Sequence, residues 1–154
     1  MKNKFMREAI RLALRNVGNG GGPFAALVVK RGRILATGVN RVTASNDPSA
    51  HAEIVAIRNA CRKLKSFQLA GCEIYTTSEP CPMCLGAIYW ARPRRVYFGS
   101  TRKDAARAGF DDSFIYQQLK LPHSRRKIPC TSLLGAASLK AFAAWERREN
   151  KIPY

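Results

Sequence analysis

Residues 73–98 read EIYTTSEPCPMCLGAIYWARPRRVYF, and this stretch predicts a strand, a helix and a second strand in close succession. The β-branched and aromatic residues in Glu73–Thr77 and Arg95–Phe98 are typical of strands. Between them we expect a helix over Pro82–Trp90, because a proline at the first helical position favours a helix start. The stretch therefore indicates an α/β protein.

The same alternation of elements extends in both directions along the chain. On the N-terminal side we expect two helices and a hairpin of strands, over Phe5–Val17, Phe24–Lys30, Ile34–Val39 and a helical segment that follows Pro48–Ser49. On the C-terminal side we expect two further helices and a fifth strand, over Asp104–Arg107, Ala136–Arg148 and Cys130–Leu134. This order predicts a three-layer α/β/α sandwich with a central mixed five-stranded sheet, in a single domain spanning residues 1–154.

Composition narrows the class of protein further. The apolar fraction of 46% is enough for a core, no apolar run is long enough to span a membrane, and the basic N-terminus lacks the features of a signal peptide. Five cysteines, two of them in one C-x-x-C, form a poor disulfide framework and favour a reducing cytoplasm. The net charge of +17 would attract polyanions such as nucleic acid, although a solvated basic surface explains it equally well.

Two thiols and one imidazole form a candidate metal site. Cys81 and Cys84 lie three positions apart at the start of the predicted helix, so both sulfurs project from one face. The only histidines are His51 and His123, which excludes a site built from several imidazoles. One His and two Cys are a suitable set of ligands for Zn²⁺, with the fourth position left for water.

Glu53 is the candidate acid/base of this site. It follows His51 by two positions, and such residues do not share a helix face. Both side chains approach one metal only from the first turn of a helix, which is where Pro48–Ser49 places them. Glu53 is therefore predicted to move protons beside a water that the zinc activates, and not to ligate the metal.

The combined pattern of H-x-E followed by P-C-x-x-C is the signature of zinc-dependent deaminases, and here 26 residues separate Glu53 from Pro80. A structural zinc knuckle would need four protein ligands, and the chain has no second C-x-x-C to supply them. A non-catalytic basic zinc module that binds nucleic acid would account for the charge. It would not account for a glutamate beside a zinc ligand.

Three segments resemble the bacterial guanine deaminases of the cytidine-deaminase fold, namely SNDPSAHAEIVAIRNAC, SEPCPMCLGAIYWARP and DAARAGFDDSFIY. The resemblance runs from Gly22 to Tyr154. It implies a hydrolase that acts on a cyclic amidine C–N bond and converts guanine to xanthine and ammonia in purine metabolism. It also implies a homodimer whose subunits exchange a C-terminal segment.

The resemblance also assigns roles to individual residues. Glu53 would carry the proton, and Asp112 would bind the amino group and help to protonate it. The groups implied to contact the purine are Asn40, Phe24, the backbone N–H of Ala52, Trp90 and Tyr154. Among these, Phe24 would stack on the ring, Trp90 would wall the pocket and Tyr154 would close it.

Each of these side chains also has a purely structural interpretation. Asn40 could form a turn at the end of a strand, and Phe24 could belong to the core. Asp112 could cap the helix that follows it. Tyr154 could fray in solvent, as chain termini commonly do.

Two other deaminase activities compete with guanine deamination. A tRNA adenosine deaminase shares nearly the same zinc motif, and the basic charge favours it. The segment GFDDSF and the final tyrosine argue against it, because the resemblance implies that tRNA deaminases generally lack both. A tyrosine that closes the pocket would also oppose the entry of a flipped nucleotide, which an RNA enzyme must admit. A guanosine deaminase would need only a little more room for the ribose. The favoured partner is thus a small purine, and nucleic acid is the alternative.

Overall fold

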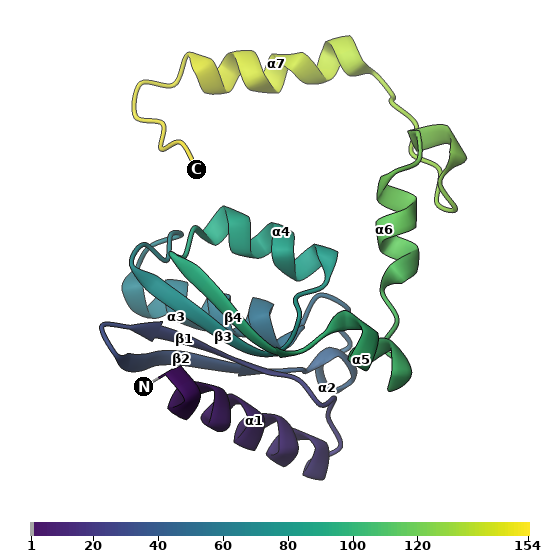
Figure 1. Ribbon diagram of the computed structural model, residues 1–154. Helices are drawn as coiled ribbons and strands as arrows, with labels where there is room; N and C mark the ends of the chain where they lie inside the picture. Colours follow the sequence, from purple (N-terminus) through teal and green to yellow (C-terminus); the bar gives the residue numbers. More distant parts are fainter. Residues whose placement is uncertain (1) are drawn as a thin grey trace. The chain divides into compact units, whose positions relative to one another are not determined.

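The computed structural model describes residues 2–154, which divide into two compact units. The first unit extends to Asp112, and the second comprises Ser113–Tyr154. Figure 1 traces the chain from its purple N-terminus to its yellow C-terminus. Within the described residues, no helix is both long and apolar enough to cross a membrane. The assignment of the whole chain to a single domain stays a prediction.

Four strands form the sheet of the first unit: β1 (Ala25–Lys30), β2 (Arg33–Val39), β3 (Cys72–Ser78) and β4 (Arg95–Ser100). They lie in the order β2-β1-β3-β4. Strand β1 is antiparallel to both β2 and β3, whereas β3 and β4 are parallel. The predicted hairpin and the predicted mixed sheet are therefore confirmed.

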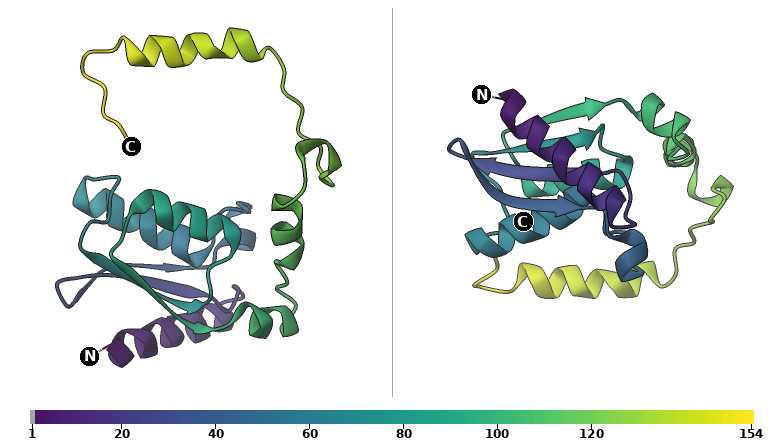
Figure 2. Two further views of the ribbon diagram at one scale, coloured as in Figure 1. Left: turned by 45° about the horizontal axis from the view of Figure 1, so that its top comes forward. Right: turned by 90° about the horizontal axis from the view of Figure 1, so that it is seen from below.

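Helices cover both faces of this sheet (Figure 1; Figure 2). The covering helices are α1 (Lys2–Gly18) on one face, and α3 (Ala52–Leu64) and α4 (Pro82–Ala91) on the other. Residues alternate along β1, because successive side chains of a strand point to opposite faces. Ala26 and Val28 join the core cluster that includes residues of α3 and α4, whereas Leu27 and Val29 join the cluster with Phe5 of α1. The three-layer arrangement is confirmed.

Helix α1 contains the predicted helix over Phe5–Val17 and ends one residue later, at Gly18. Its buried residues, Phe5, Ala9 and Ala13, follow one another at four-residue spacing and so share one face. The Phe5 ring contacts Tyr75 of β3 at a centroid distance of 5.2 Å. This contact anchors the start of the helix to the middle of the sheet.

The first unit also contains two short helices. Helix α2 (Val42–Ser45) follows β2 and was not predicted. Helix α5 (Arg102–Arg107) follows β4 and begins with a capping box. In that box the Asp104 backbone N–H donates to the Thr101 hydroxyl, and the Thr101 backbone N–H donates to the Asp104 carboxylate at 2.8 Å.

The predicted fifth strand at Cys130–Leu134 is wrong. Among the described residues the sheet has four strands, and residues 130–134 are exposed and irregular. Leu134 adopts a φ of 52°, which lies in the left-handed region and is incompatible with a strand. The second unit consists instead of α6 (Ser113–Leu119), a 3₁₀ turn (His123–Arg125) and α7 (Gly135–Glu146).

Candidate active site

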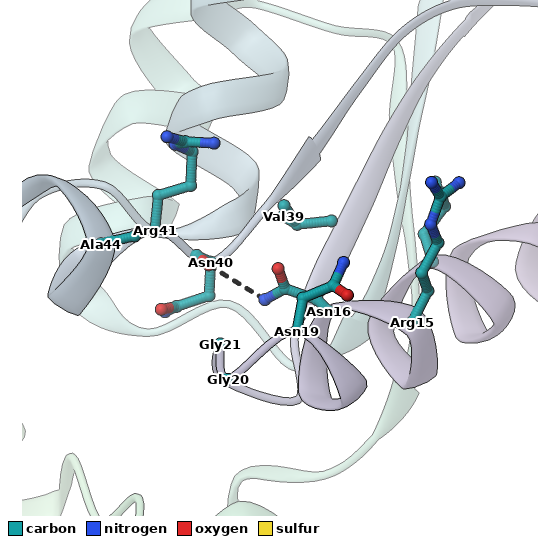
Figure 3. A pocket seen from close by; sticks show the side chains of 10 residues that line it. Arg15, Asn16, Asn19, Gly20, Gly21, Val39, Asn40, Arg41 and Ala44 are labelled. Carbon is teal, nitrogen blue, oxygen red and sulfur yellow. Dashed lines mark hydrogen bonds between the residues drawn. The ribbon is translucent and has the colours of Figure 1, made fainter.

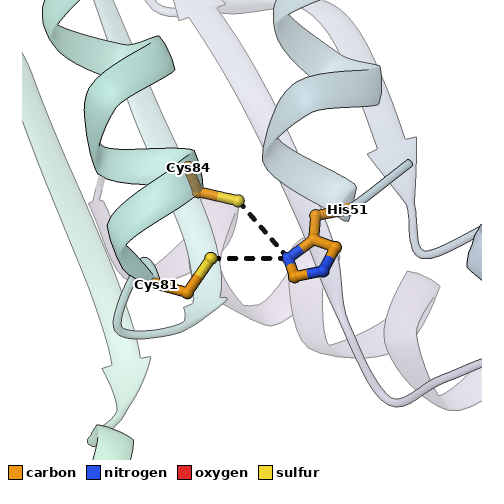
Figure 4. Close-up of side chains that lie close together, drawn as sticks. All are labelled: His51, Cys81 and Cys84. Atoms are coloured by element: carbon orange, nitrogen blue, oxygen red, sulfur yellow. Dashed lines mark hydrogen bonds between the residues drawn. The ribbon is translucent and has the colours of Figure 1, made fainter. Parts of the chain in front are cut away.

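The three predicted metal ligands lie together at the starts of two helices (Figure 4). The Nδ1 atom of His51 is 3.6 Å from Cys81 Sγ and 3.5 Å from Cys84 Sγ. All three ligand atoms lie within 4.8 Å of one another. We refer to His51, Cys81 and Cys84 as the metal triad.

Local backbone geometry explains this convergence. His51 is the N-cap of α3 and Cys81 is the N-cap of α4, and both have the extended backbone that N-cap residues adopt. Pro82 follows at the first position of α4, where its missing N–H costs no hydrogen bond. Two helix N-termini therefore point at the triad, and their positive dipole ends favour thiolate over thiol.

The two thiols of the triad differ in pKa. The hydrogen bond from Cys84 and, after it, the neighbouring imidazole of His51 lower the pKa of the Cys81 thiol to about 4, against the effect of burial. The same hydrogen bond, together with burial, raises the pKa of Cys84. Two sulfurs and one imidazole nitrogen within this distance form a donor set that fits Zn²⁺, which prefers such ligands in tetrahedral geometry.

Glu53 lies beside the triad and not among its ligands. Its side chain is only 6% exposed, and this burial raises the pKa of the carboxyl. The Thr76 hydroxyl donates a hydrogen bond to Oε1 at 3.0 Å, and Cys84 Sγ lies 3.5 Å from Oε2. A carboxyl held in this way next to a metal site can accept and release a proton close to neutral pH.

Thr76 is a functional residue that the sequence did not reveal. A threonine in the middle of a strand is common, so its identity carries no signal. Its contact with Glu53 joins β3 to the first turn of α3, two segments that are distant in the chain. Gly38 of β2 was missed for the same reason. A Cβ at that position would collide with the Ala52 carbonyl oxygen and the Ala56 nitrogen, so only glycine lets α3 lie this close to the sheet.

The residues implied to contact the purine, apart from Tyr154, lie in several segments of the first unit. Ala52 is fully buried as the first residue of α3, where a backbone N–H has no acceptor within its own helix. Phe24 meets Phe110 edge to face, with the ring centroids 4.9 Å apart. Phe24 also packs against the core, whereas its stacking on a purine stays a prediction.

Asn40 lines a pocket of about 350 Å³ between α1, β2 and α2 (Figure 3). Its Oδ1 atom accepts a hydrogen bond from the Val42 backbone N–H at 3.3 Å, which is the bond expected of an asparagine in a turn. The side chain of Asn16 reaches the same region from α1. It donates to the carbonyl oxygens of Gly22 at 2.8 Å and Asn40 at 3.0 Å.

Asp112 and Trp90 differ in how far the structure supports their implied roles. Asp112 is half-buried, and its pKa is raised first by burial and then by the negative charge of Cys81. This effect of Cys81 indicates that Asp112 lies near the triad. Trp90 is 62% exposed near the end of α4, whereas the triad lies at the start of that helix. Its role as a pocket wall stays a prediction.

Tyr154 ends the second unit, and its side chain is 73% exposed. The proposed closure of the pocket by this residue therefore stays a prediction as well.

A mixed sheet that carries one His and two Cys at helix N-termini, with a buried glutamate beside them, defines the class of zinc-dependent deaminases. Residues 1–100 match the cytidine and deoxycytidylate deaminase zinc-binding region, and the chain belongs to this family. The family and the metal triad together identify Zn²⁺ as the cofactor.

Comparison with individual proteins separates the members of this family. The guanine deaminase of Bacillus subtilis (strain 168) is 52% identical over 151 residues, which is 97% of each chain. Its crystal structure superposes with a TM-score of 0.96 at 51% identity, over 99% of this chain and 98% of that one. The tRNA-specific adenosine deaminase of Aquifex aeolicus (strain VF5) is 42% identical over 66% of this chain and 68% of its own.

Proposed function

We propose that this chain hydrolyses guanine to xanthine and ammonia, as a step of purine catabolism. The observation that carries the proposal is the similarity to the guanine deaminase of Bacillus subtilis, which extends over nearly the whole of both chains at 52% identity. The reaction adds water at C2 of the purine and breaks the bond between C2 and the exocyclic amino nitrogen. Glu53 and the metal triad supply the groups that such a hydrolysis needs.

Zinc, when bound by the triad, supplies a Lewis acid that makes a water molecule acidic near neutral pH. The chain's own residues then control where protons go. Glu53, held by Thr76 at 3.0 Å, takes up a proton from water and delivers it to a ring nitrogen of guanine. Asp112 binds the amino group of guanine and helps to protonate it, so that the nitrogen leaves as ammonia. Burial of Glu53 supports this role, because it brings the pKa of the carboxyl closer to neutral pH.

Purine binding in this proposal depends on groups around the triad. The Ala52 N–H donates to the carbonyl side of guanine, and Asn40 hydrogen-bonds to the ring. Phe24 stacks on the base, supported from behind by its edge-to-face contact with Phe110. Trp90 walls the pocket, and Tyr154 closes it from the C-terminal segment.

Ammonia release from guanine by purified zinc-loaded protein tests the proposal directly. Guanosine, adenine, cytidine and a tRNA anticodon stem serve as competing substrates in the same assay. Glu53→Gln keeps the size of the side chain and removes its base, so turnover should fall to the background while zinc stays bound. Turnover of the tRNA stem without turnover of guanine would refute the assignment.

Deamination of tRNA adenosine is the second candidate. Two observations favour it, namely the 42% identity to the Aquifex aeolicus enzyme and the net charge of +17. The lower identity and shorter coverage of that match rank it behind guanine. Guanosine is a closer variant of the first proposal and is separated from it by the same substrate panel.

A homodimer with an exchanged C-terminal segment is also part of the proposal. None of the described residues of the second unit is buried. Its large apolar side chains include Leu133 at 80%, Leu134 at 82% and Phe142 at 65% exposure. An exposed apolar surface of this extent is typical of a protein–protein interface. A second copy of the chain would bury it in a symmetric homodimer. Light scattering of the purified protein should give twice the chain mass of 17.1 kDa.

We place the enzyme in the cytoplasm. All five cysteines are free, and the thiols of Cys81 and Cys84 must stay reduced to hold the metal.

A further inference from the structure

One edge of the sheet gathers cationic side chains that guanine hydrolysis does not use. The triad lies where β3 ends and where α3 and α4 begin, whereas this edge lies where β3 and β4 begin and where α3 and α4 end. We call it the basic edge, and it consists of Lys30, Arg31, Arg33, Arg62, Lys63, Lys65, Arg92, Arg94 and Arg95.

Backbone contacts join the segments of the basic edge into one surface. Lys30 at the end of β1 pairs with Cys72 at the start of β3. The Cys72 carbonyl accepts a hydrogen bond from the Arg94 N–H at 2.9 Å. On the α3 side, the Lys63 ammonium donates to the carbonyl of Leu35 in β2 at 2.8 Å. The charges therefore belong to one continuous region of a rigid framework.

Almost nothing neutralises these charges within the first unit. Glu73 is the single carboxylate at the starts of the adjoining strands, and it pairs with Arg94 at 2.6 Å. No other residue of the basic edge forms an ion pair among the described residues. The surface thus presents a strong positive field to any polyanion that approaches it.

Three of the cations occupy backbone positions that normally favour glycine. Arg31, Lys65 and Arg92 have φ values of 48°, 51° and 54°, all in the left-handed region. Side chains with a Cβ are disfavoured there, and glycine is the common residue in such turns and helix C-caps. A cation at a helix C-terminus is stabilised by the helix dipole, which favours Lys65 and Arg92 as the C-caps of α3 and α4. Arg31 lies in the turn between β1 and β2 and has no such gain, so folding does not explain the cation there. Where a local preference is violated without a structural gain, a functional reason is the expected one.

The chemistry of the edge fits nucleic acid best. Most of its cations are arginines, whose planar guanidinium matches the geometry of phosphate oxygens. Phe67 stands two positions after Lys65 and is 48% exposed, so it offers an aromatic face on which a base can stack. Cationic side chains combined with an exposed aromatic ring form the usual platform for single strands.

We propose that the basic edge binds single-stranded nucleic acid at a site separate from the deaminase pocket. Arg31, Lys65 and Arg92 contact phosphates, and Phe67 stacks on a base. This binding does not depend on the identity of the deaminated substrate, because the edge shares no residue with the triad or with the groups that contact the purine.

Binding of fluorescein-labelled oligouridine of about 20 nucleotides, measured by anisotropy across a range of salt concentrations, tests the proposal. The key variant combines Arg31→Gly, Lys65→Gly and Arg92→Gly. It removes three charges while giving each backbone position its preferred residue, so its melting temperature should be unchanged or higher. At about 50 mM salt its affinity should fall tenfold or more, and the slope of log K against log salt should decrease by about 2.

A control of equal charge combines Arg7→Gln, Lys103→Gln and Lys120→Gln, which are exposed cations outside the edge. It should lose at most about threefold in affinity. Both variants should release ammonia from guanine at the parental rate. Phe67→Ala should weaken binding of oligouridine but not of inorganic polyphosphate, which has no bases to stack.

Equal losses of oligouridine affinity in the two triple variants would overturn the proposal, because binding would then depend only on the net charge of the protein and not on the basic edge. Absence of oligouridine binding by the parental protein would overturn it too. So would binding to phosphatidylserine vesicles without binding to oligouridine, which would identify the edge as a membrane surface. None of these results bears on guanine turnover, so failure here is distinguishable from failure of the proposed reaction.

Discussion

The side chain of Asn16, near the end of α1, donates a hydrogen bond to the backbone carbonyl of Asn40 at 3.0 Å. Its second hydrogen reaches the carbonyl of Gly22 at 2.8 Å. One amide thus ties together the segment that leads to Phe24 and the turn that carries Asn40. The contact is tight, since a Cβ on Gly21 would collide with the Asn16 amide.

Asn16→Ala should therefore weaken guanine binding without changing the rate of the chemical step. Loss of the two hydrogen bonds frees the Asn40 turn, and KM should rise about threefold to tenfold with little change in kcat. Steady-state kinetics on guanine provide the measurement. Asn19→Ala is the matched control, because Asn19 lines the same pocket and is exposed. A fall in kcat at constant KM would show that Asn16 does not act through purine binding.

Thr76→Val should lower kcat while leaving zinc in place. Valine has the shape of threonine but cannot donate the 3.0 Å hydrogen bond that holds Glu53. We expect a loss of about tenfold in kcat, together with normal zinc content by atomic absorption. Since the Thr76 bond lowers the pKa of Glu53, its removal should move the acidic limb of the kcat/KM profile to higher pH. Thr76→Ser restores the hydroxyl and should restore both quantities.

Gly38→Ala should destabilise the fold, because the new methyl group would meet backbone atoms of Ala52 and Ala56. Overpacking of this kind costs about 1–3 kcal/mol, and the melting temperature should fall by several degrees. Gly86→Ala is a matched control in α4, where a Cβ meets nothing within 4 Å. It should be neutral or stabilising, since alanine has the higher helix propensity. Equal melting temperatures for the two variants would contradict the close approach of α3 to β2.

The sequence predicted the chemistry of the site better than the arrangement around it. His51 and Cys81 could be placed because each stands at a helix start, where short-range signals fix the direction of the side chain. Thr76 and Gly38 could not, since their importance arises from contacts between segments that are distant in the chain. The error at Cys130–Leu134 has a local cause. A short apolar run has no period that excludes other backbone conformations, and Leu134 adopts the left-handed one.

The carboxyl of Asp104 should titrate at a lowered pKa, because it takes part in the capping box of α5. Hydrogen bonds from Thr101 first, and the contact with Arg107 after them, lower the pKa of this carboxyl to about 2. A carboxyl with a depressed pKa stabilises the fold at pH values above its unfolded pKa of about 3.9, and this contribution is lost as the pH falls through about 2. NMR titration of the Asp104 carboxyl gives the pKa directly. Thr101→Val should raise it more than Arg107→Gln does, and the reverse order would contradict the assigned causes.

Zinc binding should release protons and weaken as the pH falls. In the metal-free chain the hydrogen bond between the two thiols leaves Cys81 as the thiolate and raises the pKa of Cys84, which therefore keeps its proton. The neighbouring Cys81 also raises the pKa of His51, so the imidazole holds a proton to higher pH than usual. Zinc binds only the deprotonated forms of these groups, and each bound ion must displace at least the proton of Cys84.

Calorimetry of zinc binding in two buffers with different ionisation enthalpies counts those protons. The apparent heat should differ between the buffers, and the affinity should rise between about pH 6 and pH 8 as the groups lose their protons. Cys84→Ser should abolish tight binding. Cys61→Ser, which removes a half-buried thiol outside the triad, should leave affinity and proton release unchanged. Buffer-independent heats with intact affinity would mean that both thiols are already ionised before the metal arrives.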